Sequence, residues 1–192
     1  MGGYSYGDIA AKVVVDSILE YCLQNFSNQD CPSLLKDAVS YSNDCLMLKK
    51  IGLSAKELGC VVVILLIAGD EAFLAWMGDS RIYMYRNQKE VYRTEDDSLL
   101  KELSKVKVLD ASILEKYSSI VTKAIMGEEN LPSPSLAKVS VEEGDVFLLC
   151  SDGFYKDFFV ANLAASTDYI NEVLEKKALK ASDNVSFIRV EI

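Results

Sequence analysis

The longest apolar run of the sequence, CVVVILLIA from Cys60 to Ala68, constrains the fold most strongly. It is far shorter than the roughly 20 residues that a membrane-spanning helix needs, and its β-branched residues favour a buried strand. Gly69-Asp70-Glu71 follows as a hairpin turn, and Asn87-Gln88-Lys89 forms a second turn among further strand-like segments. We therefore expect an antiparallel meander between Cys60 and Thr94.

Two long segments that precede these strands space their apolar residues as helices do. The first, GDIAAKVVVDSILEYCLQNF, has Asp8 near its start, and the second, CPSLLKDAVSYSNDCLMLKKIG, has Pro32 in its first turn and Gly52 at its end. Helices grouped in blocks beside antiparallel strands predict an α+β layered fold.

The second half of the chain repeats this mixture of strand and helix patterns. LAKVSV and DVFLLCS are predicted to form a hairpin around Glu142-Glu143-Gly144, and NVSFIRVEI is predicted to be the last strand. Helical patterns cover three further stretches: 96–119, 156–164 and 167–179. Neither a linker nor an internal repeat interrupts the sequence, so we expect one domain over residues 1–192.

The net charge of −9 and the pI of about 4.6 argue against polyanions as binding partners. A nucleic-acid backbone or an anionic membrane surface would repel such a chain, so we expect it to bind neither. The five cysteines form no CxxC pair, and no signal peptide precedes them. We expect free thiols and a cytoplasmic location.

The sequence contains no histidine. This excludes histidine general bases, Ser-His-Asp triads, Cys-His pairs and histidine-ligated zinc. Any catalysis must therefore rest on carboxylates, hydroxyls, thiols, cations or a bound metal.

Three short motifs place a carboxylate in a turn or at the end of a strand: Gly78-Asp79-Ser80-Arg81, Ser151-Asp152-Gly153 and Asp183-Asn184. If these turns meet at one edge of the sheets, their carboxylates repel one another unless they are protonated or hold a cation. Oxygen ligands select hard divalent ions such as Mg²⁺ or Mn²⁺. Taken singly, each Asp is more commonly a turn or capping residue, but the order of the whole set favours a metal site.

The motifs follow one another in an order that resembles the bacterial type-2C (PPM) protein phosphatases. The resemblance is collinear over essentially the whole chain and is carried by MGGYSYGDIAA, LGCVVVILLI, AFLAWMGDSRIYMYR, TEDDSLLKEL, VTKAIMG, GDVFLLCSDGF and SDNVSFIRV. It implies an α-β-β-α sandwich, in which two antiparallel sheets are flanked by helix pairs.

The resemblance also implies a function and a site. By analogy with the family, Asp152 and Asp183 hold a binuclear Mn²⁺ or Mg²⁺ centre, and Asp79 supports a third, weaker metal. A water activated by the ions would attack the phosphorus of phosphoserine or phosphothreonine in a phosphorylated protein substrate. A Ser/Thr kinase would be the cognate partner.

The N-terminus departs from the family pattern. The family motif reads Asp-Gly-Met-Gly-Gly, and this chain begins at its Met, so we expect a sandwich that lacks the first Asp-Gly and the strands upstream. Either the start codon was placed at the Met of a longer protein, or the chain is a truncated relative; we favour the first, since the break falls inside a tight motif. The α-amino group of Met1 would disfavour metal binding, so we expect weak metal binding and slow turnover.

Two alternatives to a phosphatase remain at this point. A non-catalytic member of the family would bind a phosphorylated partner or regulate an assembly, as the missing ligands suggest. An α+β domain whose acidic turns are only turns is the other alternative, against which the collinear matches argue.

Asp97 replaces the family His of the TEDDS segment and lies outside the expected metal ligands.

Overall fold

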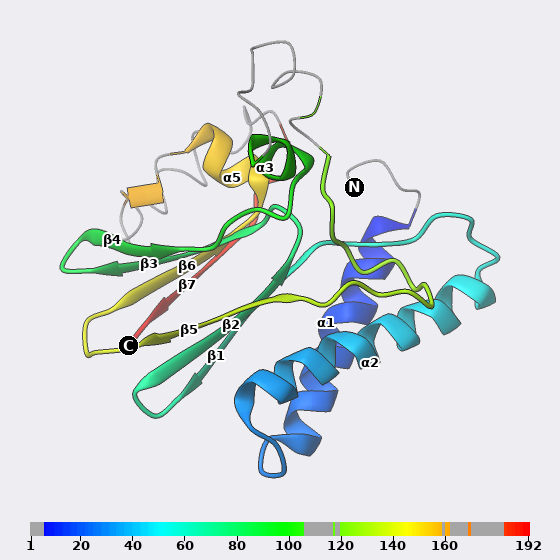
Figure 1. Cartoon of the computed structure of the whole chain (residues 1–192), viewed down its shortest axis with the longest axis horizontal. Helices are drawn as coiled ribbons and strands as arrows, with labels where there is room; N and C mark the ends of the chain where they lie inside the picture. Colours follow the sequence, from blue (N-terminus) through cyan, green and yellow to red (C-terminus); the bar gives the residue numbers. More distant parts are fainter. Residues whose placement is uncertain (1–5, 106–116, 118–119, 159, 162–168, 170–182) are drawn as a thin grey trace.

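The computed structural model describes residues 6–105, 117, 120–158, 160, 161, 169 and 183–192. The described part is a stack of layers: helices α1 and α2, a three-stranded sheet, and a four-stranded sheet with the short helix α5 on its outer face (Figure 1). Every strand pair in both sheets is antiparallel. The predicted α+β class with two antiparallel sheets is therefore confirmed.

Helices α1 (Gly7–Asn25) and α2 (Cys31–Gly52) pack on each other and on one face of the three-stranded sheet. The N-terminus of α2 is fixed by Asp30, whose side chain accepts a hydrogen bond of 3.1 Å from the Ser33 amide. The contact between the helices and the sheet is a buried cluster that includes Val14, Val39 and Met77. Both helices match the segments that the sequence predicted.

The three-stranded sheet has the order β1-β2-β5, from β1 (Val62–Ala68), β2 (Glu71–Met77) and β5 (Ser135–Ser140). The turn between β1 and β2 needs a left-handed residue, which Gly69 supplies with φ of 64°. β2 lies at the centre of this sheet, between the helices and the second sheet. From Ala72 to Met77 all of its residues are buried, which explains why its apolar run does not alternate.

The four-stranded sheet has the order β4-β3-β6-β7. Its strands are β3 (Arg81–Arg86), β4 (Lys89–Arg93), β6 (Val146–Cys150) and β7 (Phe187–Glu191). Asn87 and Gln88 make the turn between β3 and β4 with φ of 50° and 62°, as the predicted turn requires. The inward faces of the two sheets meet in a buried cluster that includes Leu74, Met84 and Phe147.

Two predicted pairings are wrong. The segment from Cys60 to Thr94 is not one meander, because the chain passes from the first sheet to the second between β2 and β3. LAKVSV and DVFLLCS do not form a hairpin, since β5 pairs with β2 and β6 pairs with β3 and β7. In a sandwich, consecutive apolar strands can either pair in one sheet or face each other across two, and the apolar pattern is the same in both cases.

Helix α5 (Asp152–Asp157) covers the outer face of the four-stranded sheet, where Phe154 and Phe158 pack against Tyr83 and Leu148. Of the predicted helix in 96–119, the structure describes α3 (Leu99–Ser104). Most of the helices predicted at 156–164 and 167–179 lie outside the described residues, so the second helix pair of the sandwich stays a prediction. In the described ranges, every helix is too short or too polar to cross a bilayer.

The two sheets leave their edge strands β1 and β7 on the same side of the sandwich. Within the described part of the chain, β1 pairs only with β2, and β7 pairs only with β6. An apolar pocket of about 240 Å³ lies between them, with Val62 and Ile188 among its lining residues. The Ile188 side chain on β7 is exposed.

Candidate functional site

The three predicted site residues lie at one end of the sandwich. Asp79 follows β2, Asp152 follows β6, and Asp183 precedes β7. The strand register brings these segments together, because Arg81 is paired with Cys150 and Cys150 with Phe187. The corresponding strand ends lie near α3 and α5 (Figure 1).

Gly78 determines how the chain reaches Asp79. Its φ is 111°, a value that L side chains rarely adopt, and a Cβ there would lie 2.2 Å from Cγ1 of Val61. The carbonyl of Gly78 accepts a hydrogen bond of 2.8 Å from the Asp97 amide. Gly78 thus lets the chain change sheets in three residues and places Asp79 at the seam between the sheets.

Gly153 brings the second and third motifs into contact. A Cβ on Gly153 would lie 2.4 Å from the carbonyl oxygen of Asn184 and 3.1 Å from Cβ of Asp183. Ser151 fastens the same two segments, since its amide donates to the Ser186 carbonyl at 3.0 Å and its hydroxyl accepts from the Ser186 amide at 3.1 Å. The structure therefore places the Asp183-Asn184 turn directly beside the start of α5.

The charges around Asp79 and Asp152 are coupled. Burial, and then the negative charge of Asp152, raise the pKa of the Asp79 carboxyl. Burial acts in the same direction on Asp152, but the hydrogen bond and the charge of Lys156 outweigh it and lower the pKa of Asp152. Lys156 Nζ lies 2.7 Å from Oδ2 of Asp152. One positive side chain thus balances part of a negatively charged site.

The charges of all three aspartates act on Lys156. Burial alone would lower the pKa of its ammonium, but the hydrogen bond and the charge of Asp152, followed by the charges of Asp79 and Asp183, raise it. Sequence reasoning missed Lys156. The signal was its spacing of four residues from Asp152 at the start of a helix, which puts the two side chains on one face.

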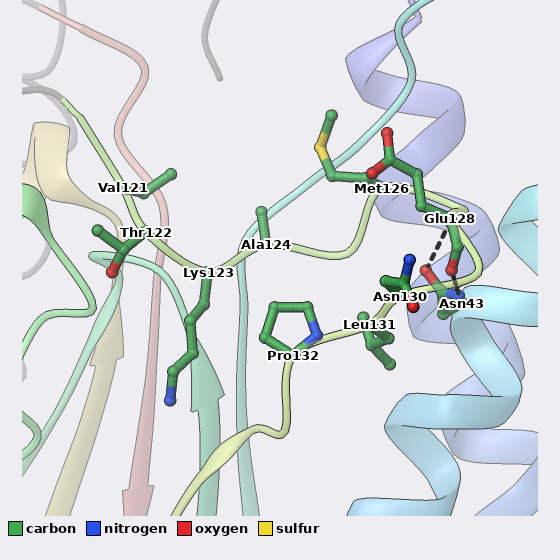
Figure 2. Close-up of a pocket in the computed structure, with 10 residues that line it drawn as sticks. All are labelled: Asn43, Val121, Thr122, Lys123, Ala124, Met126, Glu128, Asn130, Leu131 and Pro132. Atoms are coloured by element: carbon green, nitrogen blue, oxygen red, sulfur yellow. Dashed lines mark hydrogen bonds between the residues drawn. The ribbon is translucent and has the colours of Figure 1, made fainter.

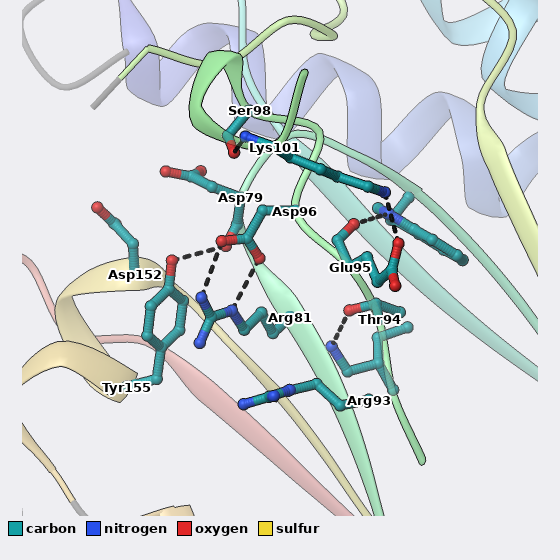
Figure 3. Close-up of polar contacts among 12 residues, drawn as sticks. Asp79, Arg81, Arg93, Thr94, Glu95, Asp96, Ser98, Lys101, Asp152 and Tyr155 are labelled. Carbon is teal, nitrogen blue, oxygen red and sulfur yellow. Dashed lines mark hydrogen bonds and ion pairs between the residues drawn. The ribbon is translucent and has the colours of Figure 1, made fainter. Parts of the chain in front are cut away.

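Arg81 and Tyr155 hold the turn that carries Asp79 (Figure 3). The Arg81 guanidinium donates two hydrogen bonds of 2.8 Å to the two carboxylate oxygens of Asp96, and its Cζ lies 3.7 Å from the ring centroid of Tyr155. The Tyr155 hydroxyl donates to the backbone carbonyl of Asp79 at 3.0 Å. Neither contact was predicted from the sequence.

A pocket of about 300 Å³ adjoins this scaffold. It shares Arg81 and Asp96 with the scaffold, and Lys101 is paired across it with Glu95 at 2.7 Å. Its lining residues are Arg81, Arg93, Thr94, Glu95, Asp96, Ser98 and Lys101. The pocket thus carries charges of both signs next to the aspartates.

Asp97 makes a different set of contacts, and its expected place outside the metal ligands stays a prediction. Its side chain is buried, pairs with Lys123 at 3.4 Å, and accepts a hydrogen bond of 3.0 Å from the Ser135 hydroxyl. Its other carboxylate oxygen, Oδ2, has no hydrogen-bond partner within the described residues. Asp97 therefore ties the 120–135 segment to the end of β2, where its amide donates to the Gly78 carbonyl.

Another pocket, of about 250 Å³, is formed where the 121–132 segment meets α2 (Figure 2). Asn43 of α2 holds that segment, with its Nδ2 donating to the Glu128 carbonyl at 2.8 Å and its Oδ1 accepting from the Glu128 amide at 3.3 Å. Gly127 allows the close approach, because a Cβ there would lie 2.8 Å from the Met47 amide nitrogen. These contacts explain the pocket as a packing feature, and it contains none of the three predicted site residues.

The donor set fits a hard divalent cation in chemistry and in charge. Asp79, Asp152 and Asp183 offer only oxygen ligands, and the field of Asp152 on Asp79 is the repulsion that a bound cation would relieve. In the described ranges, however, no three side chains of Asp, Glu, Cys or His come together in a group able to hold a metal ion. Within the described residues, the three aspartates therefore do not form a complete metal site.

Comparisons with known proteins show the family of the chain. The family model described as "Protein phosphatase 2C" matches residues 1–184. The serine/threonine protein phosphatase PstP of Mycobacterium tuberculosis is 26% identical over 156 residues, which are 80% of this chain and 30% of that protein. The protein phosphatase PhpP of Streptococcus pneumoniae is 35% identical over 100 residues, which are 51% of this chain and 40% of that protein.

The fold is also found among solved structures. The catalytic domain of the serine/threonine protein phosphatase PstP, crystallised in complex with 2 manganese ions, superposes with a TM-score of 0.76 at 20% identity, covering 98% of this chain and 82% of that chain. At this identity the likeness concerns the fold. The chain spans less than half the length of the two curated relatives above. Because the family model matches nearly the whole sequence, the chain belongs to the protein phosphatase 2C family.

Proposed function

We propose that this protein hydrolyses phosphoserine and phosphothreonine in phosphorylated proteins, with Mn²⁺ or Mg²⁺ as cofactor. The chain belongs to the protein phosphatase 2C family, and its relatives PstP and PhpP are a serine/threonine protein phosphatase and a protein phosphatase. The observation that carries the proposal is the meeting of the Asp152 and Asp183 motifs at Gly153, with the charge of Asp79 beside them. A cytoplasmic protein with a Ser/Thr kinase as partner would fit this role.

In this proposal, Asp152 and Asp183 hold two ions and Asp79 supports a third, weaker one. When bound, the ions supply activation of a water and neutralisation of the phosphoryl oxygens. The chain itself positions the ligands. Tyr155 and Arg81 hold the Asp79 turn, Gly153 allows the Asp183 turn to approach, and Lys156 has to give up its ion pair with Asp152.

A non-catalytic role is the second candidate, and one observation favours it. Within the described residues no group of three ligands is assembled, so this chain would bind metal weakly and turn over slowly. A phosphatase-like domain of this kind would bind a phosphorylated partner or regulate an assembly. The two roles differ in whether phosphate is released.

The test is Mn²⁺-dependent phosphate release from a phosphothreonine peptide. We expect slow but measurable release that stops when a chelator is added and is lost in Asp152→Asn. Asp16→Asn is the matched control, because Asp16 also pairs with a lysine one helical turn away, on α1. Release that survives Asp152→Asn or the chelator would rule out the metal-dependent mechanism, and absence of release with retained phosphopeptide binding would favour the second candidate.

A further inference from the structure

Lys156 stands out among the lysines because of what its ammonium faces. Its Nζ lies 2.7 Å from Oδ2 of Asp152, and the two side chains are 46% and 30% exposed. The negative charges that act on it come from Asp152, Asp79 and Asp183, which are the three proposed metal ligands. Its ammonium thus sits in the field that a bound divalent ion would experience.

The pair between Lys12 and Asp16 on α1 provides the comparison. It has the same spacing of four residues and an N···O distance of 3.1 Å, but its side chains are 78% and 61% exposed. Such a pair is an ordinary solvated helix contact worth little. Lys156 differs in that its ion pair with Asp152 is less exposed and the charges of Asp79 and Asp183 also act on it, so its position depends on whether Asp152 has another counter-ion.

We propose that Lys156 is a tethered counter-ion that occupies Asp152 when no metal is bound and competes with the divalent ion for it. A carboxylate oxygen that accepts a hydrogen bond from an ammonium is a poorer metal ligand, and an ammonium at this position also repels the incoming cation. Metal binding therefore requires the flexible lysine side chain to turn out to solvent. This inference rests on the proposed metal-dependent function and adds a residue that sets the metal affinity.

The experiment is a calorimetric titration of the whole chain with MnCl₂. We expect Lys156→Gln to bind Mn²⁺ about three- to tenfold more tightly than the unmodified protein, the range expected when a partly exposed ion pair is removed beside a cation site. Lys156→Arg keeps the charge and should bind with the affinity of the unmodified protein. Lys12→Gln, the matched control on α1, should also leave the affinity unchanged.

A second readout, the increase in melting temperature on adding Mn²⁺, depends neither on catalysis nor on a measurable heat of binding. At a fixed, limiting MnCl₂ concentration, the increase in melting temperature should be larger for Lys156→Gln than for the other three proteins, because tighter binding to the folded state stabilises it more. Without metal, Lys156→Gln should melt close to the unmodified protein.

The outcomes separate this inference from the proposed function. Equal Mn²⁺ affinity in the unmodified protein and in Lys156→Gln would overturn the role of Lys156 while leaving the metal site in place. Absence of Mn²⁺ binding in all four proteins would overturn the proposed function, and this inference with it. Binding that is detected only in Lys156→Gln would support both.

Discussion

The Tyr155 hydroxyl donates a hydrogen bond of 3.0 Å to the backbone carbonyl of Asp79, which links helix α5 to the turn between the two sheets. The ring of Tyr155 also carries the Arg81 guanidinium on its face. One side chain thereby connects two of the three aspartate motifs, since α5 begins at Asp152. The site depends on contacts between side chains that lie far apart in the sequence.

Removal of this hydroxyl should loosen the Asp79 turn. We expect Tyr155→Phe to lower the free energy of unfolding by about 1 kcal/mol, the usual value of one net hydrogen bond, and Tyr155→Leu to lower it further because the cation–π contact is lost as well. Urea denaturation followed by circular dichroism measures both. Equal stability of the two variants would show that the ring contributes nothing beyond the hydroxyl.

Gly153 should not tolerate a side chain. In Gly153→Ala the new Cβ would meet the Asn184 carbonyl at 2.4 Å, so we expect a loss of about 2 kcal/mol in the free energy of unfolding and weaker Mn²⁺ binding. Gly52→Ala at the end of α2 is the matched control, because nothing lies within 4 Å of a Cβ there. A Gly153→Ala protein as stable as this control would contradict the close packing of the two motifs.

The bidentate geometry of Arg81 should matter more than its charge. Lysine cannot donate two parallel hydrogen bonds to Asp96 or stack a planar group on Tyr155, so we expect Arg81→Lys to cost about 2 kcal/mol of stability. Chemical denaturation measures the loss. If Arg81→Lys were as stable as the unmodified protein, the charge alone would account for the contact.

The stability of the second sheet should depend on pH through Asp145. Two hydrogen bonds of 2.8 Å from Arg86 reach this buried carboxylate, and they lower its pKa below the usual value although burial acts in the opposite direction. Because the pKa is depressed in the folded state, the contribution is fully present above the unfolded-state pKa of about 4 and is lost as the pH falls through the folded-state pKa.

Asp145→Asn tests this dependence. The variant should be less stable than the unmodified protein at pH 7, and the difference should shrink as the pH falls below about 4. Urea midpoints measured from neutral to acidic pH give both curves. If the difference in stability between the two proteins stayed constant over this pH range, Asp145 would not contribute to the pH dependence of stability.

Many helices, strands and turns of the fold could be predicted from the sequence, because local sequence signals determine them. Pro32 at the start of α2 and the Asn87-Gln88 turn are local signals that identify their elements. The assignment of strands to sheets is not local. The chain changes sheets at Gly78, between β4 and β5, and between β5 and β6. The apolar pattern is the same whether two consecutive strands pair in one sheet or face each other across two.

The candidate site divides in the same way. The motif order predicted which aspartates to expect at one end of the sheets, and the structure places their motifs there. Tyr155 and Asp96 could not be predicted from motifs, since their roles come from a hydrogen bond to a backbone carbonyl and a contact with an arginine distant in the chain. The ion pair between Lys156 and Asp152 could have been predicted from their spacing of four residues in a helix.

Within the described residues β1 is an edge strand, and this has a consequence for handling the protein in solution. β1 is seven apolar residues without a charge, a proline or a bulge to protect it. We expect slow, concentration-dependent self-association that speeds up as salt screens the net charge of −9, which light scattering would detect. For this chain, colloidal behaviour would then be governed by one strand and not by the acidic surface.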